Sequence, residues 1–172
     1  MPHKIELLRA SVRNAKILHQ LSVSTFRDAF GAQNRQQDMD KYVSEEMSLE
    51  RLTQELEDEA NYFYLAWYDG RLVGYCKIRA NREPDIIGER PLEIERIYVT
   101  EQFQGRGVGA ALMEHCIAFA GEHGHDVLWL GVWEFNTEAV NFYKEWGFEL
   151  CGSHPFLLGE DLQTDVLMRK DI

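Results

Sequence analysis

The residues with the clearest chemical potential form a glycine-rich hexapeptide in the second half of the chain: Gln104, Gly105, Arg106, Gly107, Val108 and Gly109. Apolar residues recur at four-residue spacing from Val108 to Ala120, which predicts a helix that runs to about Glu122. Amide groups at a helix N-terminus bind anions, and glycine lets a phosphate approach the backbone. We therefore interpret residues 104–109 as a pyrophosphate cradle with Arg106 as an extra cation. An ordinary glycine-rich turn is the alternative.

A dinucleotide site is a second alternative for the same hexapeptide. Gly105, Gly107 and Ala110 match the fingerprint G-x-G-x-x-[G/A]. That fingerprint places its first glycine directly after a strand, whereas five residues separate Val99 from Gly105. A doubly wound sheet also needs several more strand–helix units than residues 106–172 can supply. The sequence therefore disfavours a dinucleotide site.

The segment before the cradle, Leu92–Val99, is predicted to be an irregular β-strand. Its apolar side chains stand at positions 92, 94, 97 and 99, so their parity slips by one. A strand that keeps one core face tolerates this slip only with an extra residue, so we predict a β-bulge near Glu95 and Arg96. Glu93 and Glu95 then share the face opposite the apolar side chains at 92 and 94, unless the bulge separates them. A bulge also leaves backbone groups free for a ligand.

The remaining periodicity predicts a mixed α/β fold in one domain, residues 1–172. The expected strands are Lys4–Leu8, Tyr62–Tyr68, Arg71–Arg79, Val127–Val132, Phe148–Cys151 and Thr164–Met168. The expected helices start near Val12, cover about Ser24–Glu59 as one helix or a pair, and later span Val108–Glu122 and Asn136–Trp146. Asp69-Gly70 is a hairpin-turn signal, and Asn136 is a helix cap.

Composition excludes several classes of function. The 172 residues carry 18 Lys and Arg against 29 Asp and Glu, a formal net charge of −11. This charge argues against binding to nucleic acid or to an anionic membrane, and it is compatible with a cationic small molecule. The three cysteines form no CxxC pair and the histidines lack ligand spacing, so we expect reduced thiols and no metal. No apolar run approaches 18 residues, and we expect a cytoplasmic protein.

Two motifs resemble one known family. The run Ile94–Gly109 is similar to the core motif of the GCN5-related N-acetyltransferases (GNAT), whose loop reads [Q/R]-x-x-G-x-[G/A]. Gln104, Gly107 and Gly109 fill its three specified positions. A downstream segment resembles the family's later motif through Asn136, Ala139, Phe142, Tyr143, Gly147 and Phe148. The resemblance implies the GNAT acyl-CoA N-acyltransferase fold, a central twisted mixed sheet with a bulged strand and helices on both faces.

A narrower resemblance is to the PaiA-type spermidine/spermine N-acetyltransferases. The similar segments are residues 24–30, 92–99, 129–134, 152–156 and 163–165. This resemblance implies acetyl transfer from acetyl-CoA to a primary amine of a small cationic acceptor, a polyamine, by direct attack in a ternary complex. Two alternatives stay open. One is a GNAT enzyme acting on a protein N-terminus, a lysine or an antibiotic; the other is a non-catalytic acetyl-CoA sensor.

By the same resemblance, the acetyl-CoA site has three parts. Backbone groups of Ile97, Tyr98 and Val99 bind the pantetheine arm, and the Ile97 N–H can polarise the thioester carbonyl. The amides of residues 105–109 bind the pyrophosphate. Asn136 hydrogen-bonds the pantetheine, serves as a plain helix cap, or does both.

The candidate catalytic residues are Tyr143, Glu93 and Glu95. A phenol is well matched to protonate the departing thiolate, so Tyr143 is the expected general acid; a packed aromatic side chain is the alternative. Glu93 and Glu95 are candidates for the general base, for binding a distal ammonium, or for purely structural ion pairs. His154 and His19 are weaker candidates for the base.

The acceptor is expected to meet an aromatic and acidic surface. Aromatic rings bind cations and methylene chains together, which points to Phe26, Asp28, Phe30 and Trp133. Alternatively, Phe26 and Phe30 form only the core face of one helix. Exposed strand edges near the C-terminus are compatible with a homodimer.

Overall fold

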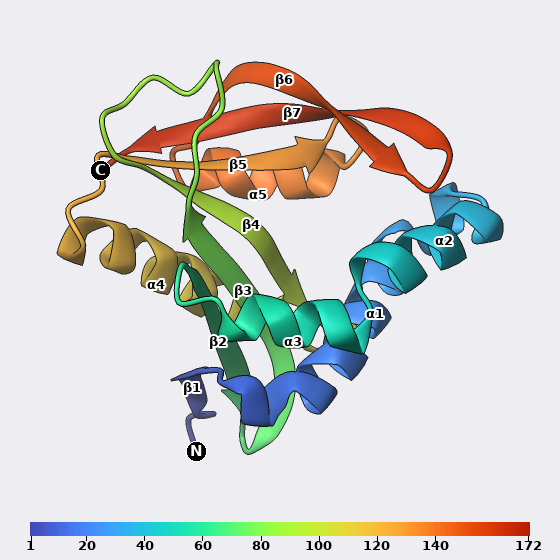
Figure 1. The fold of residues 1–172 in the computed structure, drawn as a ribbon. Coiled ribbons are helices and arrows are strands. Elements are labelled where there is room, and N and C mark those ends of the chain that lie inside the picture. Colours follow the sequence, from blue (N-terminus) through green and yellow to red (C-terminus); the bar gives the residue numbers. More distant parts are fainter.

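The computed structural model describes residues 1–172 and contains one seven-stranded sheet (Figure 1). The strands are β1 (Ile5–Arg9), β2 (Asn61–Tyr68), β3 (Arg71–Ala80), β4 (Pro91–Val99), β5 (Val127–Trp133), β6 (Glu149–Leu158) and β7 (Asp161–Asp171). The α-helices are α1 (Ala15–Phe30), α2 (Gln36–Glu46), α3 (Leu49–Glu57), α4 (Val108–Glu122) and α5 (Thr137–Glu145). Short 3-10 turns occupy Val12–Asn14, Gly31–Gln33 and Glu101–Phe103. None of the helices has the length and apolar composition needed to cross a membrane.

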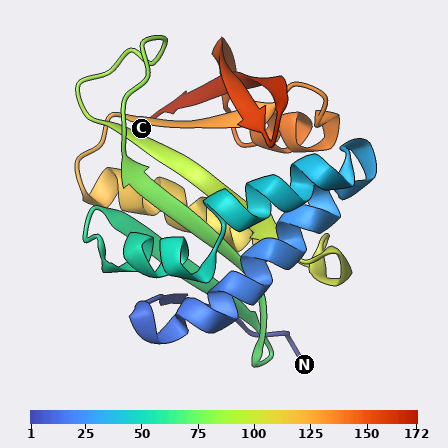
Figure 2. The ribbon, with the colours of Figure 1, turned by 45° about the vertical axis from the view of Figure 1, so that its right-hand side comes forward.

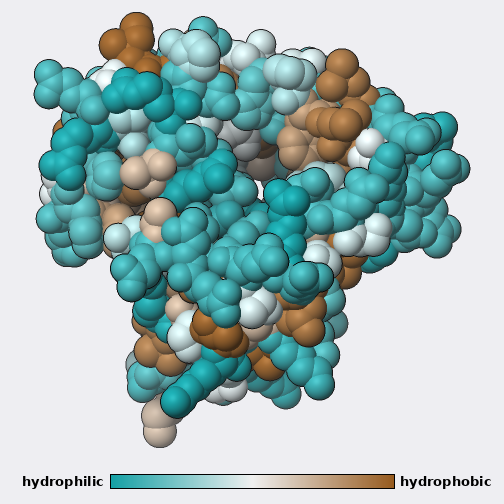
Figure 3. Space-filling view, viewed as in Figure 1, coloured by the Kyte–Doolittle hydropathy of each residue, from teal (hydrophilic) through white to brown (hydrophobic).

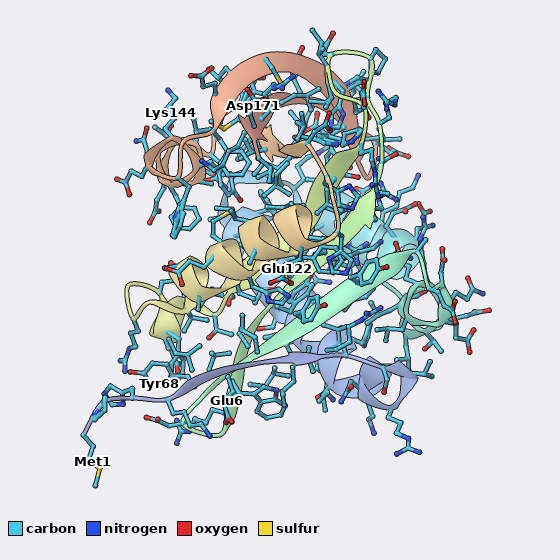
Figure 4. All side chains as sticks on the ribbon, turned by 90° about the vertical axis from the view of Figure 1, so that its left-hand side faces the viewer. Met1, Glu6, Tyr68, Glu122, Lys144 and Asp171 are labelled. Carbon is cyan, nitrogen blue, oxygen red and sulfur yellow. The ribbon has the colours of Figure 1, made fainter.

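The strand order is β1-β2-β3-β4-β5-β7-β6, and only β4 and β5 pair in parallel. This mixed sheet carries helices on both faces, as the family resemblance implies (Figure 2). Helices α4 and α5 bury apolar side chains such as Leu112 and Tyr143 against one face. Helices α1 and α3 bury Leu18 and Leu52 against the other face, over Phe63. Figure 4 shows α4 along the sheet, with Glu122 at its C-terminal end.

The predicted bulge in β4 is confirmed. Lys77 pairs with Arg96 and the next residue, Ile78, pairs with Ile94, so Glu95 is the extra residue. The insertion keeps the apolar side chains of β4 on the α4 face on both sides of the slip. It also leaves Glu95 and Arg96 adjacent in the chain and on the opposite face of the sheet.

The sheet opens between β4 and β5. These strands pair only over Pro91–Glu93 and Val127–Trp129, and then they diverge (Figure 1). Beyond Glu93, one edge of β4 therefore has no neighbouring strand. A cavity of about 670 Å³ lies in this opening.

Two sequence-based boundaries were wrong. The expected helix start at Ser24 lies inside α1, which continues to Phe30. The Ser22 and Thr25 hydroxyls donate to backbone carbonyls of the preceding turn, so these polar side chains are accommodated within the helix. The closing strands β6 and β7 are longer than the expected segments 148–151 and 164–168, because their hairpin extends over α2.

The far end of the β6–β7 hairpin is fixed to α2. The Asp38 carboxylate accepts a hydrogen bond from the Glu160 N–H at 3.0 Å and another from Arg35 Nε at 2.8 Å. Gly159 lies so close that an added Cβ would stand 2.5 Å from the Asp38 Cα. Hydrophobic side chains gather on the outer surface of this hairpin end, where Leu157 is exposed (Figure 3).

Replacing Gly159 by alanine should destabilise the protein because Gly159 has φ +62° and touches the Asp38 backbone. Left-handed backbone costs a non-glycine residue about 1 kcal/mol, and the clash should raise the loss to about 2 kcal/mol or more. Gly70→Ala is the matched control, because Gly70 has φ +81° and open space around it. Urea denaturation measures both free energies of unfolding; equal losses would contradict the close contact.

Candidate active site

The cavity between β4 and β5 brings together most residues that the sequence singled out. These lining residues are Phe26, Asp28, Phe30, Glu93, Glu95, Ile97, Tyr98, Val99, Gln104, Gly105, Gly109, Trp133, Asn136 and Tyr143. Three residues of the hexapeptide do not line it. Arg106 is exposed, with its guanidinium over the Phe103 ring, Gly107 is the N-cap of α4, and the Val108 side chain is buried in the core.

The N-terminus of α4 presents free backbone amides. No side chain caps it, and Gly107 occupies the cap position in a left-handed conformation with φ +85°. An added Cβ at Gly105 would meet no atom within 4 Å, so space is open beside the loop. Gln104 Nε2 donates to the Val99 carbonyl at 3.2 Å and ties the loop to the end of β4. Uncapped amides next to open space suit the pyrophosphate of an acyl-CoA.

The open edge of β4 adds backbone groups to the site. Thr100 N–H donates to the Val73 carbonyl on β3 at 2.8 Å. Backbone groups alternate sides along a strand, so those of Ile97 and Val99 point away from β3, toward the gap left by β5. Those of Tyr98 point toward β3, opposite Tyr75. Tyr98 therefore meets the cavity through its side chain, a distinction that the sequence could not make.

Two polar residues on the α5 side lie close to this edge. Tyr143 is buried and its hydroxyl forms no hydrogen bond within the protein. Burial raises the pKa of Tyr143, so its phenol stays protonated at neutral pH. Asn136 caps α5, since its side-chain oxygen accepts from the Ala139 N–H at 3.2 Å. Its cavity-lining position leaves its amide NH₂ as the group for a ligand.

Glu93 and Glu95 share one face of β4, as predicted, but neither is free. Glu93 Oε2 accepts hydrogen bonds from Arg79 Nε and Asn81 Nδ2, both at 2.8 Å. Glu95 Oε2 lies 2.6 Å from Lys77 Nζ and 3.3 Å from Arg79 Nε. Burial would raise the pKa of Glu95, but the neighbouring cations Arg96, Lys77 and Arg79 outweigh it and hold that pKa below its usual value.

Sequence reasoning missed the cations that surround these carboxylates. Lys77 and Arg96 have side chains only 3% and 14% exposed, and both pair with Glu55 of α3. A lysine in the middle of the otherwise apolar strand Val73–Ile78 was the available signal, because buried lysines are almost always paired. The partner on α3 had no signal in the sequence.

Aromatic rings line the part of the cavity next to α1 and β5. The Phe30 ring lies 6.3 Å from Trp133 and 6.4 Å from Tyr98, measured between ring centroids. Phe26 stacks on Tyr42 at 4.9 Å and belongs to a core cluster. Phe26 is therefore mainly a core residue, whereas Phe30 also faces the cavity, and a role of either residue in acceptor binding stays a prediction. Tyr42, which sequence reasoning missed, also lines it.

His154 lies at the same end of the cavity between two carboxylates. Its Nε2 is 3.5 Å from Asp165 Oδ2 and its Nδ1 is 3.3 Å from Glu83 Oε1. Hydrogen bonding to Asp165 raises the pKa of His154 and favours the imidazolium. A carboxylate oxygen faces each ring nitrogen, which argues against His154 as the base.

Comparisons with known proteins agree with this geometry. The acetyltransferase (GNAT) family profile matches residues 23–148. An uncharacterised N-acetyltransferase of Lactobacillus delbrueckii subsp. lactis is 37% identical over 170 residues, 96% of each chain. Streptothricin acetyltransferase of Streptomyces lavendulae is 33% identical over 94 residues, 55% of this chain and 47% of that protein.

The fold is also found among solved structures. The PaiA N-acetyltransferase of Thermoplasma acidophilum, solved in complex with coenzyme A, superposes with a TM-score of 0.78. The two chains are 17% identical, with 98% of this chain and 99% of that one covered. The family profile and the Lactobacillus relative both agree with the open β4 edge and the uncapped α4 N-terminus. The chain therefore belongs to the GNAT family and is an acetyl-CoA-dependent N-acetyltransferase.

Proposed function

We propose that this acetyltransferase acts on a primary amine of a small cationic acceptor, a polyamine such as spermidine or spermine. One observation carries the proposal: the acceptor cavity combines aromatic rings with carboxylates that no lysine or arginine neutralises. These carboxylates are Asp28, Glu101 and Glu138. An extended cation with methylene spacers suits such a surface, because rings contact the chain and carboxylates attract its ammonium groups.

The proposed reaction is direct attack in a ternary complex. The ammonium first loses a proton, and the amine nitrogen then forms a bond to the thioester carbon. The Ile97 N–H hydrogen-bonds the developing oxyanion, a donor of the kind whose removal costs about 3 kcal/mol. The carbon–sulfur bond then breaks, and Tyr143 protonates the leaving thiolate. The nitrogen gives up its second proton in the same collapse, which yields the amide and restores the Tyr143 phenol.

We assign the first proton transfer to Glu95, directly or through a water. Glu95 is the bulge residue, two positions from Ile97, and its side chain is 22% exposed against 9% for Glu93. Glu93 is the alternative acceptor of this proton. It is more enclosed, and Arg79 and Asn81 both hydrogen-bond it.

The test is thiol release from acetyl-CoA across spermidine, spermine, a lysine peptide and an aminoglycoside. Saturable release with the polyamines, and none with the others, is the expected result. No release with any amine, while acetyl-CoA still raises the melting temperature, would overturn the acceptor assignment.

A second candidate acceptor is an antibiotic amine, favoured by the similarity to streptothricin acetyltransferase. That similarity covers about half of this chain. Thiol release with the aminoglycoside, and with no other amine of the panel, would favour an antibiotic as the acceptor.

Tyr143→Phe should lower kcat about 100-fold, because general acid catalysis contributes that much or more. The dissociation constant of acetyl-CoA should stay within about two-fold of wild type, since the ring remains. Steady-state kinetics and calorimetric binding measure the two quantities. Tyr62→Phe, on the α4 face away from the cavity, is the control. An unchanged kcat in Tyr143→Phe would rule this residue out as the acid.

Asp28→Asn should raise the KM for spermidine several-fold without changing the KM for acetyl-CoA, because it removes an unpaired carboxylate beside Phe30. The difference in KM for spermidine between Asp28→Asn and wild type should shrink as the salt concentration rises, since salt screens exposed charges. Glu114→Gln removes an exposed carboxylate of α4 and should change neither constant. Equal KM values for spermidine in Asp28→Asn and wild type would exclude Asp28 from the acceptor site.

A further inference from the structure

The β4 bulge is surrounded by a compact cluster of six charged side chains, which balance as three anions and three cations. Its members are Glu55, Lys77, Arg79, Glu93, Glu95 and Arg96. Five of them lie on β3 and β4, while Glu55 alone comes from helix α3. Glu55 does not line the acceptor cavity, and neither does Lys77. Glu55 can therefore influence the reaction only through the residues that it pairs with.

Glu55 makes the closest carboxylate contacts with Arg96 and shares Lys77 with Glu95. Its two carboxylate oxygens accept from the two terminal nitrogens of Arg96, at 3.0 and 3.2 Å. The oxygen at 3.0 Å from Arg96 also accepts from Lys77 Nζ at 3.0 Å. This is the bidentate geometry that binds a guanidinium most strongly. Arg96 is thereby turned toward α3, and its nearest distance to the Glu95 carboxylate is 3.7 Å.

The buried cations must be compensated, because a charge removed from water needs a partner. Without Glu55, Arg96 would lose both of its close carboxylate contacts, and Glu95 would be the nearest carboxylate left to it. The Glu95 side chain, already 2.6 Å from Lys77 Nζ, would be drawn further toward these cations and away from the cavity. We propose that Glu55 is a positioning residue, which takes Arg96 as its counter-ion, shares Lys77 with Glu95, and so keeps the Glu95 carboxylate facing the acceptor. The inference rests on the proposed function in one respect, that Glu95 receives the proton of the amine.

The charged groups facing Glu95 determine how its pKa should respond. Lys77 and Arg79 face it from β3, and Arg96 and Glu93 face it from β4. Glu55 reaches Lys77 and Arg96 from α3, where Arg51 also lies 3.8 Å from Glu55. Tyr75 and Tyr42 lie close enough to interact with Glu95, and burial keeps both phenols neutral; it raises the pKa of Tyr42 to about 12. Removing the negative charge of Glu55 makes the surroundings of Glu95 more positive. The pKa of Glu95 should then fall further.

The decisive variant is Glu55→Gln, with Glu57→Gln as its matched control on the exposed side of the same helix. We expect Glu55→Gln to lower kcat at least tenfold, to shift the acidic limb of the pH–rate profile to lower pH, and to leave acetyl-CoA affinity within two-fold. The double variant Glu55→Gln/Lys77→Met removes one anion and one cation. It should return the acidic limb toward wild type, whereas a merely structural role predicts further damage.

A readout without any acceptor separates this inference from the proposed function. Carbon-13 NMR of labelled glutamate follows the titration of the Glu95 carboxyl, assigned with Glu95→Gln. A lower titration midpoint in Glu55→Gln, restored in the double variant, supports the inference even if wild type acetylates no polyamine. Identical Glu95 midpoints in wild type and Glu55→Gln would overturn it. So would a drop in kcat with no movement of the acidic limb.

Discussion

The separation of β4 from β5 determines where the cavity and its functional groups lie. Both strands pair at Glu93 and Trp129, and beyond this point β4 follows β3 alone. The extra residue, Glu95, increases local twist and directs β4 away from β5. One irregularity thus creates three features: the cavity, an unpaired backbone edge at Ile97 and Val99, and a face that carries the carboxylates.

The same irregularity brings charge into the protein interior. A regular strand would alternate Glu95 and Arg96 between faces, but the bulge keeps both on the α1–α3 face. Their burial is tolerated because Lys77 and Glu55 complete a neutral group. Because the charges at the bulge balance, the polyamine proposal depends on other, exposed carboxylates that line the cavity. It also links a helix outside the cavity to the chemistry inside it.

Much of this architecture was predictable because it follows local rules. The parity slip in Leu92–Val99 located the bulge, and Asp69-Gly70 located the β2–β3 hairpin. Boundaries set by tertiary contact were not predictable, such as the β6–β7 extension that packs Gly159 on Asp38. The charge cluster was not predictable for the same reason. Lys77 and Arg96 lie 22 and 41 positions from Glu55 in the sequence, and only folding brings them together.

The open edge of β4 leads us to propose that acetyl-CoA binds along it as an added strand. Residue-resolved amide hydrogen exchange by NMR, with and without saturating acetyl-CoA, tests this directly. We expect slower exchange at Ile97 and Val99 on binding, and little change at Tyr98, whose backbone faces β3. Unchanged exchange at both Ile97 and Val99 in the saturated complex would contradict it.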